Sequence, residues 1–327
     1  MTKPLLTIEQ LAISFPSEAG RTPVVDRVGV SITAGETLAL VGESGCGKSM
    51  TALAIMRLVP RPGRIEPASR MLFEDQDLMS LSVPQMRALR GSKIGMIFQE
   101  PMTSLNPVTR VGDQVMEAIR LHANVSRAEA RRRVLDQFSQ VGIPSPEMRF
   151  DAYPHQLSGG LKQRVMIAMA MAMQPRLLIA DEPTTALDAT IRAQILDLIR
   201  TLAADTGTAV LLITHDFGVV NEVADRVAVM YAGQIVEQGT RAELLGQPRH
   251  PYTQGLLKSI PTPQARGHRL NEIAGAVPRP GQWPAACRFH TRCPHVFDRC
   301  RSETPGRTSV SPTQSAWCHL VAQETRP

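Results

Sequence analysis

Short apolar runs and longer amphipathic stretches alternate along most of the chain. Compact runs of apolar and β-branched residues predict strands, at residues 5–15, 28–32, 37–41, 94–98, 177–180 and 210–213. Apolar positions three and four residues apart predict helices, at residues 50–58, 111–121, 127–141, 161–173 and 191–204. Gly20 and Pro23 are turn formers and are expected to separate the first two strands.

A late hairpin is predicted where residues 227–230 and 235–237 flank the turn Ala232-Gly-Gln. Strands that alternate with helices indicate a mainly parallel sheet with helices on both faces. Beyond residue 248 the proline content rises and the periodicity fades. We therefore expect an α/β domain over residues 1–260 and a separate extension over residues 261–327.

Composition changes this picture little but excludes some classes of protein. The chain is 43% hydrophobic and 20% charged, as a globular protein with a real core should be. It lacks both the roughly 18-residue apolar stretch that a membrane span needs and the apolar core of a secretory signal. We expect a cytoplasmic chain that reaches a membrane only through a partner.

The net charge of +6 is concentrated in the C-terminal part of the chain. Residues 261–327 carry nine Arg and four Asp or Glu, but no aromatic-rich basic segment. A solvated surface explains such a charge, so no nucleic-acid partner is expected.

A glycine-rich loop follows the strand predicted at residues 37–41. Residues 42–49 match G-x-x-x-x-G-K-[ST], which places backbone N–H groups around a phosphate at a helix N-terminus. Lys48 is expected to reach the β- and γ-phosphates of ATP, and Ser49 to bind Mg²⁺. The residues expected to contact the nucleotide here are Gly42, Glu43, Ser44, Gly45, Cys46, Gly47, Lys48, Ser49 and Met50.

An acidic pair ends the apolar run at residues 177–180. Asp181 is placed to hold Mg²⁺, and Glu182 to polarise the water that attacks the γ-phosphate. Such pairs also cap helices, so only their combination with the glycine loop makes this one persuasive. Together the two elements indicate a P-loop NTPase.

The segment Leu157-Ser-Gly-Gly-Leu-Lys-Gln163 resembles the signature motif of ABC-type ATPases, although Lys162 stands where arginine is often found. The resemblance implies a P-loop NTPase of the ABC type. Its fold is a mainly parallel core sheet with an antiparallel β subdomain and an α-helical subdomain, here followed by a small Cys-rich extension. It also implies that Ser158, Gly159 and Gly160 face the ATP held by a second ATPase subunit.

Three further segments are similar to motifs of this family in the expected order. Gln99 resembles the glutamine that contacts Mg²⁺ and the attacking water, and His215 resembles the histidine that contacts the γ-phosphate. Residues 186–188 resemble the loop that crosses the dimer interface. Phe15 is expected to stack on adenine, with a core aromatic as the alternative. The catalytic residues implied are thus Glu182, His215, Gln99 and Lys48.

Three segments are similar in sequence to the oligopeptide/dipeptide/nickel importer family, at residues 99–107, 153–158 and 250–253. That resemblance implies an ATPase at the cytoplasmic face of the membrane that powers import of di- or oligopeptides. Its expected partners are two transmembrane permease subunits, a second ATPase subunit (self or paralogue) and, indirectly, an extracytoplasmic solute-binding protein. A soluble ABC ATPase without a membrane partner, and an importer of nickel or another solute, are the alternatives.

Four cysteines gather in the C-terminal part of the chain, at Cys287, Cys293, Cys300 and Cys318. In a reducing cytoplasm a metal site is favoured over disulfides. Their gaps do not match the short pairs of structural zinc sites, and the pattern resembles the region that in some peptide-importer ATPases carries a [4Fe–4S] cluster. A cluster, Zn²⁺ and unligated thiols all stay open, with four neighbouring arginines expected to balance a cluster's charge.

Overall fold

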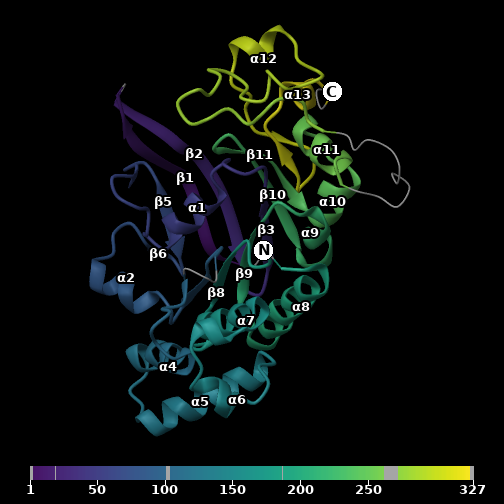
Figure 1. Ribbon diagram of the computed structural model, residues 1–327. Helices are drawn as coiled ribbons and strands as arrows, with labels where there is room; N and C mark the ends of the chain where they lie inside the picture. Colours follow the sequence, from purple (N-terminus) through teal and green to yellow (C-terminus); the bar gives the residue numbers. More distant parts are fainter. Residues whose placement is uncertain (1–2, 19, 101–103, 186, 261–271, 325–327) are drawn as a thin grey trace. The chain divides into compact units, whose positions relative to one another are not determined.

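The computed structural model describes residues 3–18, 20–100, 104–185, 187–260 and 272–324. It divides into two compact units, which are taken one at a time. The first unit comprises Met1–Ile32, Thr37–Met79 and Thr214–Pro327, and the second comprises Thr33–Glu36 and Ser80–Ile213. Figure 1 labels the helices and strands of both.

An antiparallel sheet opens the first unit (Figure 1). Its strands run in the order β2-β1-β5-β6, with β4 also pairing with β1. Their bounds are β1 Pro4–Ser17, β2 Gly20–Thr33, β4 Arg64–Ile65, β5 Arg70–Phe73 and β6 Gln76–Asp77. The predicted turn at Gly20 and Pro23 is wrong, because both residues lie inside β2. Pro23 is tolerated there because β2 is an edge strand, where a missing N–H breaks no ladder.

A second group of strands in the first unit carries the predicted hairpin. β3 (Thr37–Val41) runs parallel to β10 (Arg226–Tyr231), and β10 pairs antiparallel with β11 (Gln234–Thr240). Ala232 and Gly233 take positive φ values of 44° and 83° in the tight turn, as a two-residue hairpin requires. The hairpin prediction is confirmed.

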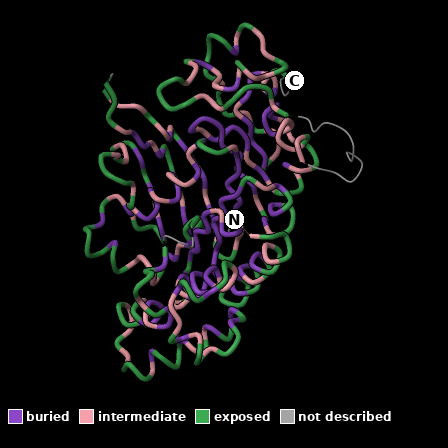
Figure 2. Tube along the Cα trace, in the orientation of Figure 1, coloured by how far each residue is buried: buried purple, intermediate pink, exposed green. Residues whose placement is uncertain are grey.

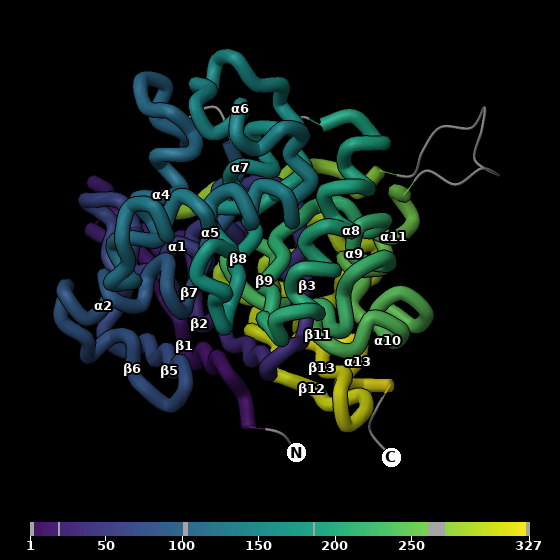
Figure 3. The backbone as a smooth tube through the Cα atoms, turned by 90° about the horizontal axis from the view of Figure 1, so that it is seen from below, coloured from purple at the N-terminus to yellow at the C-terminus, as the bar shows by residue number. Residues whose placement is uncertain are grey.

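The C-terminal residues 272–324, called the tail below, extend this group of strands. β13 (Ser315–Ala316) pairs with β11, and β12 (Thr308–Ser309) pairs with β13 (Figure 3). The helices of the first unit are α1 Lys48–Ile55, α9 Phe217–Val223, α10 Arg241–Gly246, α11 Pro251–Lys258, α12 Asp298–Ser302 and α13 His319–Glu324. The tail therefore belongs to the same compact unit as the N-terminal strands. The predicted boundary at residue 261 lies outside the described residues and stays a prediction.

Aromatic side chains join the tail to the core of the first unit. The rings of Tyr231, Tyr252 and Phe289 lie with centroids 4.6 to 5.4 Å apart, which is the range of favourable edge and tilted contacts. All three side chains are buried, Phe289 being 2% exposed. Figure 2 shows this region as a largely buried stretch of chain. The tail thus obtains its apolar core from β10 and α11.

The second unit is built on three parallel strands and a group of helices. β7 (Ile94–Ile97), β8 (Leu177–Asp181) and β9 (Ala209–Thr214) pair in that order, in parallel. All five residues of β8 are buried, as expected for an interior parallel strand. The helices are α2 Val83–Leu89, α4 Val111–His122, α5 Arg127–Gln140, α6 Pro146–Phe150, α7 Gly159–Met171 and α8 Ala189–Thr206, with a short 3₁₀ turn at Pro154–Gln156.

Candidate functional site

The phosphate loop, residues 42–49, joins β3 to α1 in the first unit. Gly42, Gly45 and Gly47 have φ values of 156°, 80° and 111°. A Cβ atom at Gly42 would lie 2.2 Å from the Met230 carbonyl oxygen. Glycine is needed there because β10 passes against the backbone of the loop. The predicted strand–loop–helix context is confirmed.

Lys48 is the first residue of α1 and is 5% exposed. Its ammonium group donates to the carbonyl oxygens of Gly42, at 2.7 Å, and Glu43, at 3.1 Å. The group is therefore held over the backbone of the loop. Cys46 is fully buried, and desolvation raises the pKa of its thiol, although Lys48 acts in the opposite direction. Cys46 is thus a small neutral residue that packs beneath the loop.

Two further predicted residues lie elsewhere in the first unit. His215 is exposed and precedes α9, whose first turn is capped by the Asp216 carboxylate at 2.8 Å from the Gly218 nitrogen. Phe15 is half-buried on β1, with its ring so close to Gly63 that a Cβ atom there would lie 2.5 Å from it. Packing against Gly63 therefore accounts for part of the burial of the Phe15 ring.

In the second unit the acidic pair ends the buried strand β8. Asp181 is 4% exposed, whereas Glu182 is half-buried. The Glu182 carboxylate accepts hydrogen bonds from Thr185 Oγ1, at 2.8 Å, and Gln99 Nε2, at 3.3 Å. Glu182 also has a φ of 48°, a left-handed conformation that is uncommon outside glycine and concentrates at functional sites. The structure therefore brings Gln99 and Glu182 together, as their predicted roles require.

The signature segment begins α7. Ser158 is the N-cap, and its hydroxyl accepts a hydrogen bond from the Leu161 N–H at 3.4 Å. Ser158 and Gly159 are exposed, so this helix start is open to a ligand or partner. Gly160 packs against α8, where a Cβ atom would lie 3.2 Å from Ile191. Asp188 caps α8 by accepting from the Ile191 N–H at 3.0 Å.

The segment at residues 99–107 is described only in part, because residues 101–103 lie outside the described residues. Ala186, the first residue of the segment 186–188, also lies outside them. Asn106 is tied to α4, since its N–H donates to the Gln114 side chain at 2.9 Å. The side chains of Phe98 and Val108 are 40% and 80% exposed.

The four tail cysteines are free thiols. Burial first, and then the neighbouring tail thiols, raise the pKa of Cys287 to about 11. Cys293 and Cys318 also have raised pKa values, through burial first and then through neighbouring thiols. Yet over the described ranges no three His, Cys, Asp or Glu side chains are arranged to hold a metal ion. The structure thus gathers the thiols without supporting the expected [4Fe–4S] cluster or Zn²⁺.

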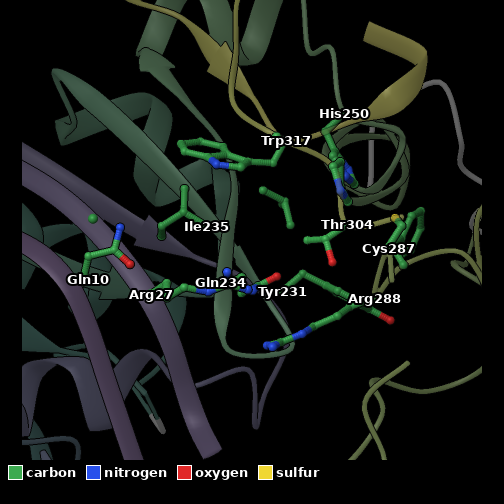
Figure 4. Close-up of a pocket in the computed structure, with 15 residues that line it drawn as sticks. Gln10, Arg27, Tyr231, Gln234, Ile235, His250, Cys287, Arg288, Thr304 and Trp317 are labelled. Atoms are coloured by element: carbon green, nitrogen blue, oxygen red, sulfur yellow. The ribbon is translucent and has the colours of Figure 1, made fainter. Parts of the chain in front are cut away.

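Of the four arginines expected to balance the charge of a cluster, Arg288, Arg292, Arg299 and Arg301, three form ion pairs with carboxylates. Arg288 pairs with Asp26, Arg292 with Glu43 and Arg299 with Glu303. Figure 4 shows Arg288 and Cys287 at one side of a cavity of about 250 Å³, opposite Gln10 and Arg27. Two of these arginines therefore attach the tail to the rest of the first unit.

Comparison with known proteins agrees with this site. A model of the ABC transporter family matches residues 25–185, and a model of the oligopeptide/dipeptide transporter C-terminal region matches residues 236–300. The dipeptide transport ATP-binding protein DppD of Escherichia coli (strain K12) is 47% identical over 315 residues, with 96% of each chain covered. The chain belongs to the ABC transporter family, in its oligopeptide/dipeptide branch.

Other comparisons extend this result. The oligopeptide transport ATP-binding protein OppD of Bacillus subtilis (strain 168) is 49% identical, covering 99% of this chain and 91% of its own. Among solved structures, the dimeric structure of a bacterial ABC transporter cassette has a TM-score of 0.65 and 25% identity, and covers 72% of this chain and 98% of its own. The expected fold, a P-loop NTPase of the ABC type, is confirmed.

As a member of the ABC transporter family, the chain is an ATPase. Across the described parts of the chain, no helix is both long and apolar enough to cross a membrane.

Two residues that contact the phosphate loop of this ABC ATPase were missed as site residues. Tyr252 Oη accepts a hydrogen bond from the Glu43 N–H at 2.9 Å, and Arg292 forms an ion pair with the Glu43 carboxylate at 2.7 Å. Tyr252 lies in the 250–253 segment that carried the family resemblance. The sequence therefore pointed to this segment but did not indicate that Tyr252 contacts the phosphate loop. Arg292 is one of many tail arginines and had no such signal.

Proposed function

We propose that this chain hydrolyses ATP to power the import of di- or oligopeptides at the cytoplasmic face of a membrane. The observation that carries the proposal is the near full-length similarity, at 47% and 49% identity, to dipeptide and oligopeptide transport ATP-binding proteins. The match includes the C-terminal region of such transporters, at residues 236–300. A soluble ABC ATPase without a membrane partner would not need that region.

In this proposal Lys48 binds the phosphates of ATP, and His215 contacts the γ-phosphate. The side-chain oxygens of Ser49, Asp181 and Gln99 are the hard donors that Mg²⁺ prefers. Mg²⁺, when bound, supplies positive charge to the phosphate oxygens.

Glu182 is proposed as the general base that takes a proton from the attacking water. Its carboxylate is oriented by Gln99 and Thr185, so it is held in one direction before any ligand arrives. Glu182→Gln keeps the shape of the side chain and one oxygen that can accept hydrogen bonds, but it removes the base. We expect ATP turnover to fall by roughly 10²–10⁴-fold, the usual contribution of a general base, while ATP binding is retained.

The measurement is steady-state phosphate release together with nucleotide titration. Glu129→Gln, a carboxylate on the exposed surface of α5 that pairs with Arg132 and Arg133, is the matched control and should leave both unchanged. Wild-type turnover in the Glu182→Gln protein would show that another group is the base.

We also propose that the ATPase works as a dimer, with an identical or paralogous chain. The exposed Ser158 at the start of α7 supports this, because an open helix N-terminus is suited to a phosphate from a second subunit. A similar cassette is known as a dimer. Closure would be driven by ATP binding the closed dimer better than the open one.

Two transmembrane permease subunits, supplied with solute by an extracytoplasmic binding protein, are the remaining proposed partners. The near full-length similarity to dipeptide and oligopeptide transport ATP-binding proteins supports these partners. An affinity pull-down from gently solubilised membranes, with partners identified by mass, tests this. Two multi-span subunits and a second ATPase are expected, and recovery of ribosomes or DNA-repair proteins alone would contradict transport.

A metal role for the tail thiols is a separate proposal. We propose that Cys287, Cys293, Cys300 and Cys318 bind a [4Fe–4S] cluster, with Zn²⁺ as the alternative. What supports it is the resemblance of the cysteine pattern to the region that carries such a cluster in some peptide-importer ATPases, together with the raised pKa values of Cys287, Cys293 and Cys318, to which neighbouring tail thiols contribute after burial.

Iron, sulfide and zinc analysis of anaerobically purified protein tests the tail thiols. Iron and sulfide are expected in the wild type and in Cys46→Ala, and are expected to be lost in Cys300→Ala. Protein that contains none of the three elements would contradict a metal site.

A further inference from the structure

Glu43, the second residue of the phosphate loop, forms hydrogen bonds through its N–H, its carbonyl oxygen and its carboxylate. Its N–H donates to Tyr252 Oη at 2.9 Å, and its carbonyl accepts from Lys48 at 3.1 Å. Its carboxylate accepts from both terminal nitrogens of Arg292, at 2.7 and 3.0 Å. The phosphate-binding motif leaves this position unrestricted, so the motif alone explains none of these contacts.

Arg292 is built into the tail as a fixed cation. Its side chain is only 4% exposed, and it also donates to the carbonyl oxygens of residues 273–275. Paired hydrogen bonds between a guanidinium and a carboxylate fix orientation as well as supply energy. Burial acts against its charge, but the Glu43 carboxylate keeps the pKa of Arg292 above its ordinary value.

The ion pair has an electrostatic consequence for nucleotide binding. The phosphate loop must accept a polyanion, and Glu43 places a negative charge in that loop, on the residue whose carbonyl Lys48 contacts. An unpaired carboxylate at this place would repel phosphate at short range. Arg292 cancels that charge from a position 249 residues along the chain.

The same contacts have a conformational consequence. Tyr252 holds the backbone of Glu43 from α11, and Arg292 holds its side chain from the tail. The loop between Gly42 and Gly45 is thus fixed by parts of the chain that follow the ATPase motifs. A ligand meets a loop already ordered, which reduces the entropic cost of binding.

We propose that Arg292 is a positioning residue for nucleotide binding: it holds the phosphate loop through Glu43 and cancels the charge of Glu43, so that ATP affinity depends on the ion pair between Arg292 and Glu43. This inference concerns the ATP site alone and does not depend on the transported solute.

Arg292→Ala in the full-length chain tests the proposal. We expect the Kd for Mg²⁺-ATP, measured by calorimetric titration, and the KM for ATP to rise roughly 10- to 100-fold, the range for loss of a hydrogen bond to a charged group. The kcat should change by no more than about twofold, because the ion pair acts on binding and not on the chemical step. Thermal melts of each variant establish that the folded protein is being measured.

Arg288→Ala is the matched control. Arg288 is also a tail arginine with little exposed side chain (12%), but its partners are Asp26 on β2, the Ala232 carbonyl and the Trp283 ring. It should loosen the tail and lower the melting temperature without raising the Kd of the folded protein. A second variant, Arg292→Ala with Glu43→Gln, removes the uncompensated charge and should recover part of the lost affinity.

Equal increases of Kd in Arg288→Ala and Arg292→Ala would overturn the proposal, because the ion pair would then serve only to dock the tail. An unchanged Kd in Arg292→Ala, or the absence of any recovery in the double variant, would overturn it as well.

Discussion

The phosphate loop and the tail belong to the same compact unit, but the contacts that hold them join residues at very different separations along the chain. The loop is formed within residues 42–49, and Lys48 contacts carbonyls only five and six positions away. The tail is attached by Arg288 and Arg292 to partners 262 and 249 positions away. A short motif therefore sets the turns of the loop and its contacts with Lys48, whereas the attachment of the tail depends on the whole first unit being folded.

The difference also separates chemistry from stability. The loop places backbone N–H groups and one ammonium group where phosphate binds, and its residues are largely turn and helix start. The tail contributes Phe289 to the aromatic core with Tyr231 and Tyr252. Substitutions in the loop should therefore change ligand binding, and those in the aromatic core of the tail should change stability.

Lys48→Ala is expected to have the largest effect and tests the loop side of this comparison. Loss of the ammonium group removes the charge that reaches the β- and γ-phosphates, so ATP affinity should fall roughly 10²-fold or more. The melting temperature should change little. Lys258→Ala, which removes an exposed lysine at the end of α11, is the control for nucleotide titration and thermal melts. A large loss of stability with retained binding would break the comparison.

Phe289→Ala tests the tail side. Removing a ring that is 2% exposed leaves a cavity against Tyr231 and Tyr252 and should lower the free energy of unfolding by about 3–5 kcal/mol. Urea denaturation measures this. Phe297→Ala removes a half-buried ring from the same tail and should cost less. Equal losses in the two variants would argue that the aromatic core does not dock the tail.

The pH dependence of one contact between α10 and the tail is the smallest expected effect. Burial acts to raise the pKa of Glu243, but hydrogen bonds from Ser311, Thr240 and Thr313 hold it at about 2, below its ordinary 4.5. The pKa of Glu243 is lower in the folded protein than in the unfolded chain. The stabilisation that the ionised Glu243 carboxylate provides is therefore complete above pH 4.5 and is lost as the pH falls toward about 2.

We therefore expect the melting temperature of Glu243→Gln to lie below that of the wild type at neutral pH. The difference should shrink as the pH falls below 4.5 toward 2. Glu303→Gln, which alters an exposed carboxylate paired with Arg299, should show a smaller difference throughout. A difference for Glu243→Gln that is constant with pH would rule out this origin.

Much of the fold was predictable from periodicity. The prediction at residues 37–41 coincides with β3, and those at 94–98 and 177–180 differ from β7 and β8 by one residue. The helix predicted at residues 127–141 ends one residue beyond α5. These elements were predictable because their apolar positions repeat with the period of the element. The short strands β4, β5 and β6 were missed, because two to four residues carry no measurable period.

The catalytic motifs were predictable for a related reason. Residues 42–49, Gln99 and the pair Asp181-Glu182 lie at the ends of strands, where a short sequence fixes both the turn and the chemistry. The link from Gln99 to Glu182 required only that β7 and β8 be neighbours. Their exact roles stay a proposal.

The sequence by itself determined the family, the phosphate loop and the ATPase chemistry, because each depends on residues close together in the chain. Only the tertiary structure decided that the tail packs into the first unit and that Arg292 and Tyr252 hold Glu43. It also decided that Arg288 pairs with Asp26. Those contacts join residues hundreds of positions apart, and no local pattern selects one arginine among the nine of the C-terminal region. Their partners are fixed by the packing of β10, α11 and the tail around a shared aromatic core.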